Sequence, residues 1–375
     1  MKNVICAAAM AVALPLTFSS AACANAASTP AATTSFDEAA RTLAEGGTLN
    51  GAVLVALGDE VVFSEGYGTA DPDTGAPFTA STPSRVASIT KQFTAATILR
   101  LAEQDRLDLD ATIGELLPWF PQGPAHAITV SQLLNHSSGL ARPAQGDMVE
   151  TAQTSAEDRI AAFAEMPLQF APGTQHRYSN SGYAVLGAII EEVAGLSYAD
   201  AVTALVLQPL DLEATMPLAD YQTRPGLAIS AVRDGSALKS DDYRVSDRGA
   251  PWSAGMMTST VADLFRWTRA LHGGEVFDDA ATLQTMLETP GGWEENRAFD
   301  NWAYASGLFH ARRDNGRAFV FHDGRLGSYL ADLRYYPEAD LTIAVLETAN
   351  GDVTATADRL EELAFAKLKN GELVR

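Results

Sequence analysis

Stretches typical of β-strands lie at both ends of this chain, while helical patterns dominate the long middle. Apolar, aromatic and β-branched residues fill positions 51–56 and 61–64 near the start, and 318–321, 329–336 and 341–346 near the end. The most economical arrangement is a single antiparallel sheet built from both chain ends and flanked by helices. We therefore predict an α/β (α+β) fold with a mostly helical lobe inserted between the two groups of strands.

The chain length also favours two lobes, because 375 residues exceed the size to which one hydrophobic core usually grows. We predict an α/β lobe from about 36–90 and 300–375, and a helical lobe over about 91–299. The clearest helix is 181–193, whose apolar residues share one face and which Gly195 ends. A site between two lobes is a common place for a pocket, so we expect the active site there.

The first 26 residues have the pattern of a secretory signal peptide. Lys2 precedes an apolar run over 4–18, and small residues follow up to Ala26, after which we predict cleavage. The apolar run is too short for a membrane anchor, so we expect no membrane span and a periplasmic or secreted protein. Lipidation of Cys23 is the less favoured alternative, because Ser20 stands where such signals usually carry an aliphatic residue. Residues 27–35 are predicted to be a flexible lead-in.

Composition excludes several classes of function. Both cysteines, Cys6 and Cys23, fall inside the predicted signal, which excludes a cysteine nucleophile and a cysteine metal site in the mature protein. The net charge of −21 argues against nucleic acid as a partner. No close histidine pair or H-E-x-x-H motif is present, so we predict no metal and no cofactor.

Ser88-Ile89-Thr90-Lys91 is the first of three motifs that carry chemistry. Positions i and i+3 share a helix face, so Lys91 can meet Ser88 and act as the base that its weakly nucleophilic hydroxyl needs. A serine at a helix start also has backbone N–H groups for a developing oxyanion. These four residues alone favour a simpler interpretation, a capped helix with a surface lysine.

Tyr178-Ser179-Asn180 is the second motif, just before the helix at 181–193. A tyrosine beside a cationic lysine can release its proton more easily and pass it to a leaving group. The Asn180 amide can hold a substrate carbonyl and the lysine together. The stretch also fits a simple N-capping cluster.

His322-Asp323-Gly324 is the third motif, at the end of a predicted strand. An exposed strand edge could pair with an extended substrate there, and Gly324 permits close approach. The backbone N–H of Arg325 would be a second oxyanion donor. Taken alone, the motif favours an ordinary strand-to-turn signal.

Together the three motifs resemble, in order and spacing, the serine β-lactamase and penicillin-binding-protein superfamily. The resemblance is to its class C-like branch of class C β-lactamases, D-alanyl-D-alanine carboxypeptidases, D-aminopeptidases and related esterases. It covers roughly residues 36–370. Further matching segments are 63–68, 85–93, 128–140, 170–195, 208–212, 254–264 and 336–350.

This resemblance implies Ser88 as the nucleophile, Lys91 as its base and Tyr178 as the catalytic tyrosine. It implies substrate-binding roles for Asn180, His322, Gly324 and Arg325. His322 replaces the lysine of the family's Lys-Thr-Gly triplet, as in many peptidase and esterase members. Asp323 and Arg325 are further departures, and all three argue against efficient β-lactam turnover. We expect His136, in a matched loop, to be structural.

We therefore expect a secreted serine hydrolase that acts through an acyl-Ser88 intermediate on an ester, a D-amino-acid peptide or amide, or a β-lactam. An esterase or D-alanyl-type peptidase is favoured over an efficient β-lactamase. The alternative is a non-catalytic cell-envelope protein that binds peptidoglycan peptides in the same cleft. Substrate specificity is expected to lie in loops 141–155 and 293–302.

Overall fold

The computed structural model describes residues 34–142, 154–217, 224–235, 237–241, 252–292, 297–299 and 301–374, with the backbone alone described at 297–299. The predicted signal and most of the lead-in lie outside these residues. Thr34–Arg375 form one unit. Ser35 is the N-cap of its first helix and accepts a hydrogen bond from the Glu38 N–H at 3.1 Å.

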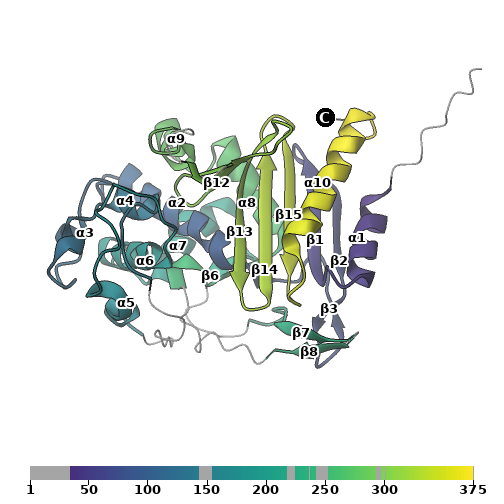
Figure 1. Cartoon of the computed structure of the whole chain (residues 1–375), viewed down its shortest axis with the longest axis horizontal. Helices are drawn as coiled ribbons and strands as arrows, with labels where there is room; N and C mark the ends of the chain where they lie inside the picture. The colour runs from purple at the N-terminus through teal and green to yellow at the C-terminus, as the bar shows by residue number, and fades with distance from the viewer. Residues whose placement is uncertain are drawn as a thin grey trace, which may run out of the picture. The chain divides into compact units, whose positions relative to one another are not determined.

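An eight-stranded antiparallel sheet joins the two ends of the chain, which confirms the predicted fold class (Figure 1). In spatial order its strands are β10 (Arg297–Phe299), β11 (Trp302–Tyr304), β12 (Phe309–Arg312), β13 (Ala318–Leu326), β14 (Tyr329–Tyr336), β15 (Leu341–Glu347), β1 (Gly51–Leu57) and β2 (Glu60–Tyr67). The N-terminal strand β1 therefore lies inside the sheet, paired with β15 on one side and β2 on the other.

Helices cover both faces of this sheet, which explains the unbroken apolar run of β1. Val53 and Val55 belong to one hydrophobic cluster, with residues of α1 (Phe36–Glu45) and α10 (Val353–Lys369). Ala52 and Leu54 point the other way, into a larger cluster that contains residues of α2 (Thr90–Glu103) and α8 (Val261–Gly273). Since both faces of β1 are buried, apolar residues are favoured at every position.

The segment between β2 and β10 is mainly helical, as predicted. Its remaining elements are β3 (Thr69–Asp71), β4 (Ala76–Pro77), β5 (Ser84–Arg85), η1 (Ala87–Ile89), α3 (Ile113–Leu116), η2 (Pro124–Ala127), α4 (Val130–Leu134), α5 (Ala156–Ala164), α6 (Asn180–Ala194), α7 (Tyr198–Val202), η3 (Thr203–Leu207), η4 (Gln208–Leu210), β6 (Met216–Pro217), β7 (Ala231–Asp234), β8 (Ala237–Ser240), η6 (Trp252–Ala254), β9 (Met257–Ser259) and α9 (Ala280–Leu287). Gly195 ends α6 with a φ of 68°, as the sequence predicts.

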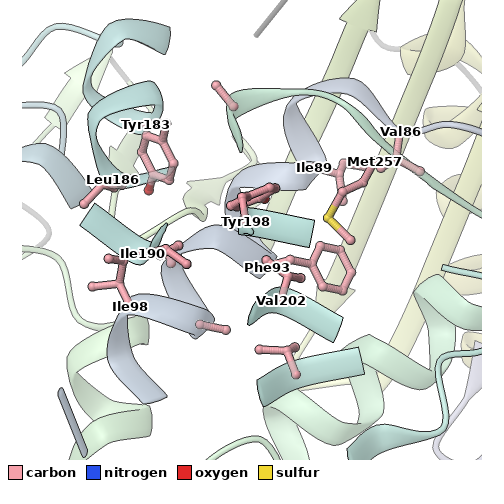
Figure 2. Packing of buried hydrophobic residues seen from close by; sticks show 14 of the residues in the cluster. Val86, Ile89, Phe93, Ile98, Tyr183, Leu186, Ile190, Tyr198, Val202 and Met257 are labelled. Carbon is pink, nitrogen blue, oxygen red and sulfur yellow. The ribbon is translucent and has the colours of Figure 1, made fainter. Parts of the chain in front are cut away.

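Helix α2 is buried along most of its length and anchors the middle of the fold. In Figure 2 its Ile98 lies beside Ile190 of α6 and its Phe93 beside Val202 of α7, and all four belong to one hydrophobic cluster. A helix enclosed in this way is a rigid support for the side chains at its start. Among the described residues no single helix is long and apolar enough to span a bilayer. The segments Asn180–Ala194 and Tyr198–Leu210 reach the length and apolar composition of a membrane span only when they are taken together, and the pair is bent by 79°.

Candidate active site

Ser88 lies in η1, the single 3-10 turn that precedes α2, so the serine is just ahead of the α-helix rather than in it. The turn is fixed by two backbone contacts, from Val86 N to the Met257 carbonyl at 3.0 Å and from Met257 N to Thr90 Oγ1 at 3.1 Å. Ala87 has a φ of 46°, a strained conformation for a residue with a side chain. Ser88 is partly exposed while Ala87 and Ile89 are buried, so this turn presents the serine to a substrate.

Lys91 lies beneath the serine and is fully buried. Its Nζ is 3.3 Å from Ser88 Oγ, 2.9 Å from Asn180 Oδ1 and 2.7 Å from the Ala254 carbonyl oxygen. Burial lowers the pKa of the Lys91 ammonium well below its usual range, and the charge of Arg142 adds to this effect.

The lowered pKa favours a neutral lysine, which has two N–H donors and one lone pair. Asn180 Oδ1 and the Ala254 carbonyl only accept hydrogen bonds, so they take the two N–H groups. The lone pair then faces the Ser88 hydroxyl. Lys91 can therefore take the serine proton without moving.

Tyr178 borders the same serine from the other side. Its hydroxyl is within hydrogen-bonding reach of Ser88, and Lys91 Nζ lies 4.8 Å from the centre of its ring. Burial raises the pKa of Tyr178, which opposes the expected release of its proton. The phenol stays protonated, and the base of the pair is Lys91.

His136 fixes the backbone on both sides of Tyr178. Its carbonyl accepts a hydrogen bond from Arg177 N at 2.9 Å, and its Nδ1 accepts one from Ser179 N at 3.2 Å. The His136 and Tyr178 ring centres lie 4.4 Å apart. Burial lowers the pKa of His136 well below its usual range, which keeps the ring neutral and Nδ1 free to accept.

Strand β13 carries the third motif and forms the sheet side of the site. β12 pairs with β13 only as far as Phe321, whereas β14 continues opposite β13 to Leu326. Residues 322–326 therefore have a neighbouring strand on one side only, as the expected free edge requires. The motif lies within the strand rather than at its end, because the ladder to β14 continues past Gly324.

Gly324 is required by the close approach of β13 to the serine. A Cβ at this position would lie 2.3 Å from the Val86 carbonyl oxygen and 3.1 Å from Ser88 N. A glycine thus brings the backbone of β13 against the backbone of the nucleophile. The next residue along β13 is Arg325, whose N–H is the predicted second oxyanion donor.

His322 and Asp323 point in opposite directions from β13. The His322 ring is 1% exposed, with Nδ1 2.6 Å from the Asp323 carbonyl oxygen and Nε2 3.4 Å from the Tyr304 hydroxyl. Burial lowers the pKa of His322 to about 3, so the ring is neutral at pH 7. Asp323 is the exposed side chain of the motif.

Sequence reasoning missed two partners in this site. The Ala254 carbonyl leaves no side-chain signal, although residues 254–264 lie in a matched segment. The contact of His136 with Tyr178 spans a loop and could not be read from spacing. Of the expected specificity loops, residues 143–153 and 293–296 lie outside the described residues.

The chain is similar to proteins of known family. The family model described as Beta-lactamase matches residues 36–367. "Protein flp" of Staphylococcus aureus (strain COL) is 29% identical over 310 residues, which are 80% of this chain and 59% of that protein. The chain thus spans less than two thirds of that relative.

Two other proteins are similar in sequence or in fold. "Esterase EstB" of Burkholderia gladioli is 30% identical over 276 residues, which are 64% of this chain and 69% of the esterase. The crystal structure of a penicillin binding protein from Bacillus halodurans superposes with a TM-score of 0.75 at 22% identity. That likeness covers 86% of this chain and 98% of the other and concerns the fold.

Proposed function

Because the chain belongs to the β-lactamase family, we propose that it is a serine hydrolase acting through an acyl-Ser88 intermediate. One observation carries the proposal. The Ser88 hydroxyl lies between the Tyr178 hydroxyl and the buried Lys91 Nζ, whose other contacts are hydrogen-bond acceptors. This arrangement supplies both a base and a proton donor to one serine.

The proposed reaction has two steps. Ser88 Oγ attacks the substrate carbonyl carbon while its proton moves to Lys91, and the backbone N–H groups of Ser88 and Arg325 hold the oxyanion. The leaving group departs with a proton delivered from Lys91, directly or through the Tyr178 hydroxyl. Water then attacks the acyl-serine, the proton from this water passes through the same groups to Ser88 Oγ, and the acid is released.

We propose an ester or a D-amino-acid peptide or amide as the substrate, in preference to a β-lactam. At the family's lysine position, His322 is buried and neutral, so it provides no positive charge for a lactam carboxylate. The exposed Asp323 carboxylate would repel that group. Similarity to an esterase supports this preference.

We further propose export to the periplasm or the exterior, on the pattern of residues 1–26. The alternative, non-catalytic binding of peptidoglycan peptides, would need neither a low pKa at Lys91 nor a partly exposed Ser88. Both features favour the enzyme.

Covalent labelling tests the proposed nucleophile. A serine-directed fluorophosphonate should label the purified protein once, on Ser88, and Ser88→Ala should abolish labelling and short-chain ester hydrolysis. Ser131→Ala is the matched control, because Ser131 is partly buried and lies in α4. Persistent labelling of a folded Ser88→Ala variant would place the nucleophile elsewhere.

A further inference from the structure

Asp323 places a carboxylate on the solvent side of the site. Along β13, His322 and Gly324 are buried and Asp323 between them is exposed. Gly324 is the residue that contacts the backbone of Ser88. The Asp323 charge acts on both Lys91 and Tyr178, so the carboxylate is close to the groups proposed to move the proton.

The basic side chains near this carboxylate have other partners. Those that act most strongly on Asp323 are Lys91, Arg325 and Arg334. Lys91 donates to Asn180 and to a backbone carbonyl. Arg325 is 3.3 Å from Asn350 Oδ1, and Arg334 is bound to Asp332 at 2.8 Å.

No ion pair or hydrogen bond from another residue reaches the Asp323 side chain within the described part of the chain; the backbone N–H of Asp323 is the donor found there. The side chain is exposed, so a substrate group can reach it. A carboxylate with no ion-pair partner attracts a cation. A substrate can provide that cation.

A positive charge also borders the site. The guanidinium carbon of Arg142 lies 5.9 Å from the centre of the Tyr178 ring, and its side chain is exposed. A charged substrate group can therefore meet either sign, depending on whether it lies nearer to Asp323 or to Arg142. The position of a charged group within the substrate therefore decides its effect.

We infer that Asp323 is a specificity-determining residue that selects substrates carrying an ammonium group over those carrying a carboxylate on the β13 side. The inference rests on the proposed hydrolase function and narrows its substrate class. The substrates are esters or amides of compounds with a free amino group, such as aminoacyl esters and amides. Anionic acyl donors are disfavoured by the same charge.

Matched substrates test this inference. One series consists of p-nitrophenyl esters whose acyl chains have equal length and end in a methyl, a trimethylammonium or a carboxylate group. A second series carries the same three groups on the leaving-group ring of phenyl acetate. Each kcat/KM is compared between wild type and variant on one substrate, so that differences in intrinsic reactivity cancel.

Three variants are compared with the wild type. Asp323→Asn removes the charge at nearly constant volume, and Asp323→Lys reverses it. Asp314→Asn is the matched control, because Asp314 is an exposed carboxylate in the turn before β13 and gives the same change in net charge. Thermal unfolding of every variant establishes that it is folded.

In at least one series, Asp323→Asn should lower the ratio of kcat/KM for the trimethylammonium substrate to kcat/KM for the methyl substrate. The expected decrease is about tenfold or more, the size expected for a lost charge-assisted interaction. Asp323→Lys should make the carboxylate the preferred substrate, and Asp314→Asn should leave the ratios unchanged. High salt should weaken the preference. Changes in the basicity of Lys91 affect all three substrates alike and leave the ratios unaltered.

Two failures are distinguishable. If Ser88→Ala abolishes turnover but Asp323→Asn and Asp323→Lys keep the wild-type ratios in both series, the inference about Asp323 is wrong and the hydrolase proposal stands. If Ser88→Ala keeps full activity, the proposed function itself is wrong.

Discussion

Replacement of His136 by leucine should damage both stability and catalysis, because one residue fixes the backbone on either side of Tyr178. The leucine keeps an apolar side chain but loses the Nδ1 acceptor. Ser179, which donates to that nitrogen at 3.2 Å, is 3% exposed, so its N–H would be left buried without a partner. Such a group costs about 1–3 kcal/mol.

The backbone of His136 adds a second term. Its φ is 61°, in the left-handed region, which histidine and asparagine adopt more readily than leucine does. The loss in the free energy of unfolding for His136→Leu should therefore lie toward the upper end of about 1–3 kcal/mol. His136→Asn tolerates the same φ and provides an amide oxygen, so it should recover more than half of this loss.

The catalytic effect follows from the position of Tyr178. A displacement of about 1 Å at a catalytic group can cost on the order of 100-fold in rate. We expect kcat for a short-chain ester to fall by that factor in His136→Leu, with a smaller change in KM and a rescue by His136→Asn. A loss of stability alone would lower the active fraction without altering the pH profile of kcat.

Urea unfolding and steady-state kinetics across pH are the assays. The pH profile of kcat should change in His136→Leu, because the Tyr178 hydroxyl no longer has a fixed place beside Ser88. A folded His136→Leu variant with wild-type kcat, pH profile and unfolding free energy would refute the reasoning. If His136→Asn lost as much stability and kcat as His136→Leu, the hydrogen-bond acceptor at this position would not be the cause of the loss.

Three other predictions follow from the same site and its surroundings. Lys91→Ala should lower kcat/KM for a short-chain ester by about 10²–10⁴-fold and more than His322→Ala does, and the reverse order would exchange their roles. Gly324→Ala, whose Cβ would lie 2.3 Å from the Val86 carbonyl oxygen, should lose about 1–3 kcal/mol in urea unfolding and most of its activity; a wild-type result would contradict the close approach. Burial raises the pKa of Glu347 from an ordinary 4.5 to about 7, so the folded state favours the protonated carboxyl, and stability should fall as pH rises from about 4.5 to 7. Glu347→Gln should flatten this part of the curve of melting temperature against pH, and an unchanged slope would exclude Glu347 as its source.

Much of the fold was predictable because apolar patterns reflect burial on the sheet. Residues 51–56 are apolar throughout and 341–346 are apolar except for Thr342, and both become strands covered on two faces. The strands β11 and β12 were missed. They have only three and four residues, too few to give a recognisable alternating pattern. Part of their stabilisation comes from contacts between strands, such as that of Trp302 with Phe309.

The site was predictable where chemistry resides in side chains of fixed spacing. Ser88 and Lys91 are one helical turn apart, and their meeting follows from helix geometry. The Ala254 carbonyl contributes through its backbone, and any residue type has that group. Burial of Tyr178 depends on packing between distant segments, so the direction of its pKa shift could not be obtained from the motif.

The pairing of β1 with β15 has a consequence for how this protein acquires its fold. Asn50 and Thr348 are hydrogen-bonded across 298 positions of sequence, so the centre of the sheet closes only after nearly the whole chain is available. Contacts between residues so far apart in sequence slow folding, because the entropic cost of closing the long loop must be overcome before the contacts form. Until then the edge of β1 that pairs with β15 is open, and an apolar strand with an open edge is prone to aggregation. A chain truncated before β15 should therefore accumulate as insoluble material, because β15 is the strand that joins β14 to β1.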